Sequence, residues 1–191
     1  MTAEELDRAL EDALADLEVD ARRADVGAWL VRLPGSARPS TTTWLRHARG
    51  AAGDVLAVEA FLCRRPDDDD ALALLSRLLL RRAARPALLR PVLDGIDDAW
   101  LRADLPAVLL LDPAPGPRPA RADLGPGPTG GALVDRLLGE VASAVEDLLP
   151  RLRRPFGPRA DVLLADTGGT RPAAAVAQEP RGGPGPVDAR R

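Results

Sequence analysis

The segment from Asp54 to Asp70 constrains the fold of this chain more than any other. Asp54–Arg65 reads DVLAVEAFLCRR, and Pro66 and four consecutive aspartates follow it. Apolar residues fill both alternating rows of this run, with Leu56, Val58, Ala60 and Leu62 in one row and Val55, Ala57, Glu59, Phe61 and Cys63 in the other. Such a run, ended by proline, predicts a buried β-strand, and the aspartates predict the capped start of a helix.

The remaining periodicities extend this pattern into an α+β fold. Apolar residues three and four positions apart predict a helix of about twenty residues that is capped by Thr2 and ends near Ala24, a helix after Pro66, and a helix over Gly131–Leu149. Alternation predicts five strands: Ala28–Leu33, Thr41–His47, Val55–Cys63, Leu88–Leu93 and Ala99–Leu105. In the last of these, Trp100, Arg102 and Asp104 share one face. We therefore expect a mainly antiparallel five-stranded sheet in the order α-βββ-α-ββ-α, with the Pro91 strand at an edge or interrupted.

The length of 191 residues predicts one domain with some chain to spare. Residues 1–111 form its N-terminal part, residues 112–130 a Pro/Gly-rich insertion, and residues 131–155 its C-terminal helix, which Pro150 stops or kinks. Residues 156–191 are expected to be a mostly disordered tail. Within that tail, Ala160–Ala165 could form a short strand or a helical turn.

Composition excludes several classes of function. Lysine, asparagine and tyrosine are absent and all 26 basic residues are arginines, a bias typical of a GC-rich genome. Together with a net charge of −3, this bias makes arginine abundance weak support for nucleic-acid binding, and no nucleic-acid partner is expected. No apolar run reaches the roughly 20 residues that cross a bilayer, and residues 1–20 lack the pattern of a secretory signal. A cytoplasmic protein with no membrane partner is the expectation.

Candidate chemical groups are few. Asp67–Asp70 suit helix capping better than convergent ligation of a divalent cation. Cys63 closes an apolar strand and is interpreted as a packed side chain, although Arg64 and Arg65 would favour its thiolate. His47 is the only histidine, and no catalytic triad follows from its position. We therefore predict no catalytic residue, no metal ligand and no cofactor.

Several stretches in this order resemble the actinobacterial branch of the YbjN-domain family. The central block is Leu56–Pro66 (LAVEAFLCRRP), and the supporting stretches are Trp29–Gly35, Thr43–Leu45, Leu78–Arg82, Asp98–Pro106 and Val134–Val141. That family is similar in fold to the type III secretion chaperone-like proteins of the CesT/YopN class. The resemblance implies an α–βββ–α–ββ–α domain with a chaperone-like or regulatory, peptide-binding role.

Two functional hypotheses follow. In the first, a non-enzymatic chaperone-like or regulatory protein binds a protein or peptide partner through a sheet face, a sheet edge or a helix groove, and a homodimer is one form that this partnership can take. Helices cover both faces of the sheet, or one apolar face is left for that partner. Trp29, Trp44, Phe61 and Trp100 are the candidate contact residues, because aromatic side chains anchor interfaces. In the alternative, a small redox regulator or enzyme acts through Cys63.

Overall fold

The computed structural model describes residues 2–50, 53–84, 88–96, 98–110 and 130–166. Over these ranges the chain forms three helices and a six-stranded antiparallel sheet in the order α-ββββ-α-ββ-α. The helices are α1 (Ala3–Ala15), α2 (Asp69–Ala83) and α3 (Gly130–Phe156), and a single turn, α4 (Ala160–Leu163), follows them. The strands are β1 (Asp20–Asp25), β2 (Ala28–Pro34), β3 (Ser40–Gly50), β4 (Gly53–Cys63), β5 (Arg90–Leu93) and β6 (Ala99–Pro106).

The strands lie in the order β1-β2-β3-β4-β6-β5, so that the chain runs through a four-stranded meander and then adds β6 beside β4. All five strand pairs are antiparallel. The outermost place of β5 confirms the prediction for the strand that contains Pro91, because proline has no N–H to donate to a second neighbour.

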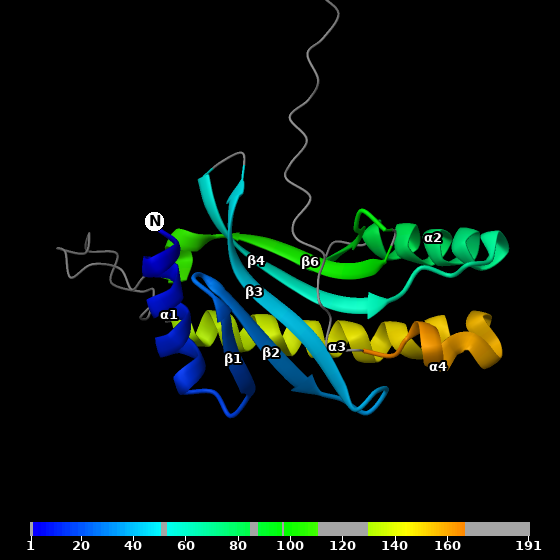
Figure 1. Ribbon diagram of the computed structural model, residues 1–191, viewed down its shortest axis with the longest axis horizontal. Coiled ribbons are helices and arrows are strands. Elements are labelled where there is room, and N and C mark those ends of the chain that lie inside the picture. The colour runs from blue at the N-terminus through cyan, green and yellow to red at the C-terminus, as the bar shows by residue number, and fades with distance from the viewer. Residues whose placement is uncertain (1, 51–52, 85–87, 97, 111–129, 167–191) are drawn as a thin grey trace, which may run out of the picture.

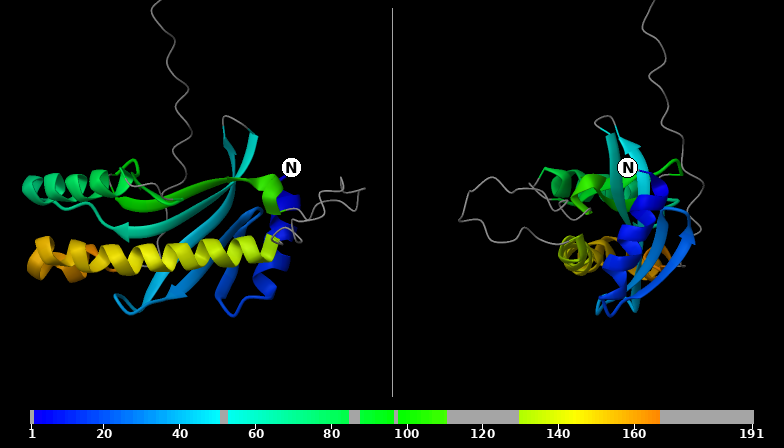
Figure 2. Two further views of the ribbon diagram at one scale, coloured as in Figure 1. Left: turned by 180° about the vertical axis from the view of Figure 1, so that it is seen from behind. Right: turned by 90° about the vertical axis from the view of Figure 1, so that its left-hand side faces the viewer.

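The helices gather on one face of the sheet. In Figure 1 the strands lie in front of α3, and the reverse view in Figure 2 shows α3 running across the sheet. α1 packs against α3, and α2 packs against β5 and α3. A single apolar core joins all of them to one row of each central strand: Val31 and Leu33, Leu45, Leu56 to Leu62 in steps of two, and Ala99 to Leu105 in steps of two.

The prediction of five strands is wrong by one strand. α1 begins as expected at the Thr2 cap. There Thr2 Oγ1 accepts a hydrogen bond from the amide of Glu5, and Glu5 Oε2 accepts one from the amide of Thr2. The helix ends at Ala15, however, and Asp20–Asp25 forms the edge strand β1. The side chains of β1 are mostly exposed. An edge strand of this kind has no apolar alternation that would reveal it in the sequence.

The C-terminal part is more ordered than the sequence predicts. α3 passes through Pro150 and Pro155 and ends at Phe156, so Pro150 does not stop it. Residues 157–166 continue as a 3₁₀ turn (Gly157–Arg159), the helical turn α4 and an extended end. Ala160 and Leu164 are buried in the core, so this part of the predicted tail belongs to the folded domain. The predicted insertion 112–130, apart from Gly130, and the tail from residue 167 lie outside the described residues.

None of the described helices is both long enough and apolar enough to cross a bilayer.

Candidate functional site: the helix-free face of the sheet

One face of the sheet carries no described helix. On this face, the alternate residues of the strands lie in cross-strand rows because the pairing is antiparallel. The central row runs from Leu30 through Trp44 and Glu59 to Arg102, and a second row includes Phe61 and Trp100. We call this surface the helix-free face, and it includes the side chains of Asp20, Arg22, Leu30, Arg32, Thr42, Trp44, Arg46, Ala57, Glu59, Phe61, Arg90, Trp100, Arg102 and Asp104.

A buried carboxylate lies at the centre of the helix-free face. Glu59 is 1% exposed, although it lies on the side away from the described helices. Arg46 holds it with two bonds, Nε to Oε2 at 2.8 Å and Nη2 to Oε1 at 3.2 Å. Arg102 donates from Nη1 to Oε1 at 3.2 Å. The two arginines therefore neutralise the charge of this carboxylate inside the face.

The charge network continues toward the β5 edge. Arg102 also donates from Nε to Oδ1 of Asp104 at 2.8 Å, and Arg90 Nη2 lies 2.7 Å from Oδ2 of the same carboxylate. The hydrogen bond to Asp104 raises the pKa of Arg102, and burial offsets only part of that effect. Three arginines and two carboxylates therefore bind one another across β3, β4, β6 and β5.

Trp44 is the aromatic side chain on this face that is partly open to solvent. It lies between Leu30 of β2 and Glu59 of β4, its direct cross-strand neighbours. The side chain is half-buried, and its Nε1–H is buried without a hydrogen-bond partner. A buried N–H donor without an acceptor costs about 1–3 kcal/mol. Such a donor is a group that a bound acceptor would stabilise.

Phe61 and Trp100 pack against each other and are buried. Their rings meet edge to face, with centroids 5.3 Å apart and planes at 79°. Trp100 Nε1 donates to Oδ2 of Asp94 at 3.0 Å. The guanidinium of Arg38 lies over the Phe61 ring, 5.7 Å from its centroid. Phe61 and Trp100 therefore build the floor of the face at its β6 side rather than its exposed surface.

Arg38 closes one end of the face where β3 and β4 separate. The last pair between these strands is Thr43 with Ala60, so the carbonyls of Phe61 and Leu62 need other donors. Arg38 donates to the carbonyl oxygens of Phe61, Leu62 and Leu164 and to Thr41 Oγ1. Burial lowers the pKa of Arg38, and the nearby Asp166 carboxylate opposes that shift.

Asp166 attaches the C-terminal end of the described chain to the same place. Its carboxylate accepts a hydrogen bond from the backbone N–H of Thr42 and lies 3.8 Å from Arg38 Nη2, and both side chains are buried. The carbonyl of Leu163 accepts from the amide of Arg64. Residues 163–166 thus fill the gap between β3 and β4.

The structure separates the four aromatic residues that the sequence singles out. Trp44, Phe61 and Trp100 share the helix-free face, but Trp29 lies on the opposite face against the core. Trp29 Nε1 donates to Oδ1 of Asp7 in α1 at 2.8 Å, so Trp29 links β2 to a helix. The sequence gives no sign that Arg46 and Arg38 belong to this site, or that Arg102 pairs with Glu59. The alternation already placed Glu59 and Arg102 on a second face, but their pairing depends on register.

Cys63 is inaccessible. A β-bulge between Phe61 and Cys63 turns its side chain into the core, so it does not share the row of Phe61 as the alternation predicts. The thiol is fully buried, and burial together with the charge of Asp98 raises its pKa to about 12. A reactive cysteine needs access and a low pKa, so both observations disfavour the hypothesis of a thiol-dependent enzyme or regulator.

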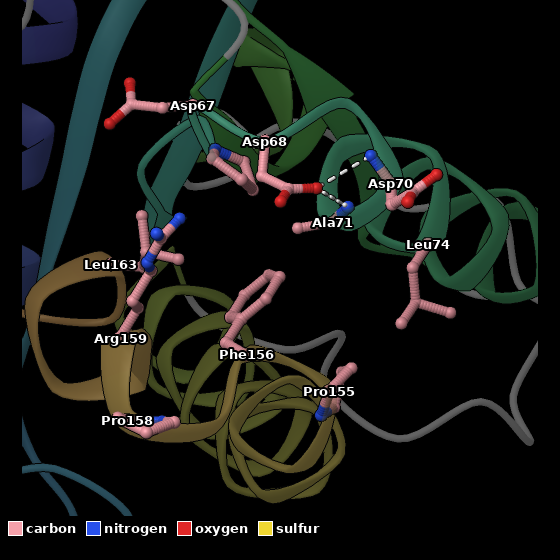
Figure 3. A pocket seen from close by; sticks show the side chains of 11 residues that line it. Asp67, Asp68, Asp70, Ala71, Leu74, Pro155, Phe156, Pro158, Arg159 and Leu163 are labelled. Atoms are coloured by element: carbon pink, nitrogen blue, oxygen red, sulfur yellow. Dashed lines mark hydrogen bonds between the residues drawn. The ribbon is translucent and has the colours of Figure 1, made fainter.

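Three of the four aspartates after Pro66 line a groove. Asp68 caps α2, with Oδ1 accepting from the amides of Asp70 at 2.8 Å and Ala71 at 3.0 Å, as the sequence predicts. Figure 3 shows the groove of about 600 Å³ between this cap and the end of α3, with Asp67, Asp68 and Asp70 on one side and Phe156 and Arg159 on the other.

The groove has few features of a ligand site. The Asp68 carboxylate is already occupied as a cap. Within the described ranges, no three histidine, cysteine or acidic side chains lie close enough to hold a metal ion. His47 pairs with Asp54, with Nε2 3.1 Å from Oδ1, near the turn between β3 and β4.

Comparisons with models of protein families, with curated proteins and with solved structures find no match to this chain.

Proposed function

We propose that this protein is a non-enzymatic, chaperone-like or regulatory binding protein that holds a segment of a partner protein on the helix-free face. The observation that carries the proposal is the orphaned Nε1–H of Trp44, which lies beside Leu30 on a face without a described helix. We propose in addition that the chain belongs to the YbjN-domain family, whose resemblance implies a chaperone-like role.

The construction of the face supports binding rather than catalysis. Its acidic and basic groups at the centre neutralise one another, and the Glu59 carboxylate is buried beneath two arginines, where a substrate on the surface does not contact it. The rigid floor of Phe61 and Trp100 holds the surface in one shape. A preformed surface with a half-buried tryptophan and surrounding arginines has the residue types that dominate binding energy at interfaces.

A photocrosslinking experiment tests this proposal in the full chain. A p-benzoylphenylalanine is placed at Pro34, which is exposed on the helix-free face two residues beyond Arg32 in β2, or at Leu80, which is 69% exposed on α2. After irradiation in cells, position 34 is expected to capture a recurrent segment of a defined protein, identified by mass spectrometry, and position 80 is not. A crosslink to a second copy of the chain would show that the partner is the same protein in a homodimer. It would still support the helix-free face as the binding surface.

Equal capture from both positions, or no capture from position 34, contradicts the proposal. A Trp44→Ala variant in the position-34 background should lower the yield of the crosslink. The matched truncation Leu80→Ala should leave that yield unchanged, because it removes apolar surface elsewhere. Circular dichroism of each variant checks that the fold is retained.

A further inference from the structure

The part of the helix-free face over β1, β2 and β3 carries hydrogen-bond donors without acceptors. Arg22 and Arg32 are exposed, and neither guanidinium forms an ion pair or hydrogen bond with another described residue. Asp20 lies opposite Arg32 in the strand register without an ion pair to it. Trp44 Nε1 adds a third donor. These residues surround Leu30 on three neighbouring strands, whereas the carboxylates Glu59 and Asp104 are already held by other arginines.

The spacing of the two free arginines fits an extended peptide. Arg22 lies directly opposite Leu30, and Arg32 is two residues further along β2. Diagonal neighbours of this kind are about 7–8 Å apart between Cα atoms. In an extended chain, side chains on the same side repeat every two residues, or about 6.6–7 Å. Acidic residues at positions i and i+2 of a bound segment would therefore reach both guanidiniums.

From these observations we propose that the segment held on the helix-free face is an acidic, extended peptide whose alternate carboxylates pair with Arg22 and Arg32. This inference rests on the proposed function and names its class of partner. The side chains between the carboxylates face away from the sheet or lie over Leu30 and Trp44. A small hollow of about 210 Å³ lies beside the two guanidiniums and is lined by Asp20, Arg22, Leu30 and Arg32, so the bound carboxylates approach the arginines on the sides away from Asp20.

Fluorescence anisotropy of labelled dodecapeptides with the full-length protein tests the inference. The probes are alternating Glu-Ala, Gln-Ala and Lys-Ala peptides, an oligo-dT of twelve nucleotides, and a peptide with the sequence of residues 167–191. The Glu-Ala peptide should bind about tenfold more tightly than the Gln-Ala peptide, because only its carboxylates form ion pairs with the guanidiniums of Arg22 and Arg32. Its affinity should fall as salt rises from 50 to 300 mM.

Paired charge variants locate the binding. The double variant Arg22→Gln/Arg32→Gln should lower the affinity for the Glu-Ala peptide to that of the Gln-Ala peptide. The matched control Arg77→Gln/Arg81→Gln removes two exposed arginines from α2 and should change the affinity by less than about twofold. An equal loss in both double variants shows a long-range charge effect and overturns the inference.

Other outcomes separate this inference from the proposed function. If the Gln-Ala peptide binds as tightly as the Glu-Ala peptide and the crosslink at position 34 is found, the face binds peptides without regard to charge and only this inference fails. Preference for oligo-dT overturns it in favour of a nucleic acid, and preference for the 167–191 peptide overturns it in favour of the chain's own segment. Absence of the position-34 crosslink removes the proposed function itself.

Discussion

Replacing Arg38 by methionine should be among the most damaging single changes in this chain. The side chain is 6% exposed and donates to four oxygens, three of which are backbone carbonyls at the separation of β3 and β4. Methionine keeps most of the apolar stem over Phe61 but has no donor. The variant therefore leaves the carbonyls of Phe61, Leu62 and Leu164 without the partner that satisfies them.

The magnitude follows from these contacts. Hydrogen bonds from a charged donor contribute about 1.5–3 kcal/mol each, and the recovered solvation of the guanidinium offsets a large part of their sum. Removing one member of a buried charged cluster costs about 3–5 kcal/mol in comparable cases. We expect a loss of about 4 kcal/mol in the free energy of unfolding, against a total of roughly 5–15 kcal/mol for a domain of this kind. Asp166→Asn, which keeps the shape but weakens the 3.8 Å pair, should cost about 1 kcal/mol.

Urea denaturation followed by circular dichroism and tryptophan fluorescence measures both values. The control Arg154→Met removes an exposed arginine from the end of α3 and should stay within about 0.5 kcal/mol of the parent protein. The double variant Arg38→Met/Asp166→Asn isolates the coupling between the two side chains. A loss below about 1 kcal/mol for Arg38→Met would refute the role of Arg38 in filling the gap between β3 and β4.

Three further predictions rest on single contacts. Thr2→Ala removes the capping box of α1 and should lower the free energy of unfolding by about 1 kcal/mol, whereas Thr2→Ser keeps the hydroxyl and should keep the stability of the parent protein. Equal melting curves for Thr2→Ala and the parent would contradict this prediction. Hydrogen bonds from Ser36 and Ala37 lower the pKa of Glu146, so its contribution to stability is present above the unfolded pKa of about 4.3 and is lost as the pH falls through the folded value. Glu146→Gln should therefore flatten the decline of melting temperature between about pH 5 and pH 3, and an unchanged slope would exclude the effect. Cys63, with its pKa raised to about 12, should not react with a disulfide reagent at pH 8 until the protein is unfolded in guanidinium; rapid reaction of the native protein would show that the thiol is accessible.

Local signals in the sequence determined much of the secondary structure. Thr2 and Asp68 mark the starts of α1 and α2 because a cap acts within one helical turn of itself. The apolar rows of β4 and β6 identify central strands, and Pro91 identifies an edge strand. In each case the cause and the effect lie within a few residues of each other, so the sequence alone is sufficient.

The same reasoning fails where a residue depends on a distant neighbour. The six residues of β1 have no apolar alternation, and they form a strand because β2 supplies the hydrogen bonds. Pro150 does not end α3, because ten of the helix's residues are buried and their packing outweighs the loss of one backbone bond.

The helix-free face is decided by tertiary structure in the same way. Alternation alone places Glu59 and Arg102 on a second face, but it does not say which strands adjoin them. The register of β3, β4 and β6 brings Arg46, Glu59 and Arg102 together across 13 and 43 residues of sequence, and the segment after α4 brings Asp166 to Thr42 across 124 residues. Side-chain period and capping are properties of a short stretch of backbone, whereas pairing and burial of charge are properties of the assembled sheet, and only the folded chain contains them.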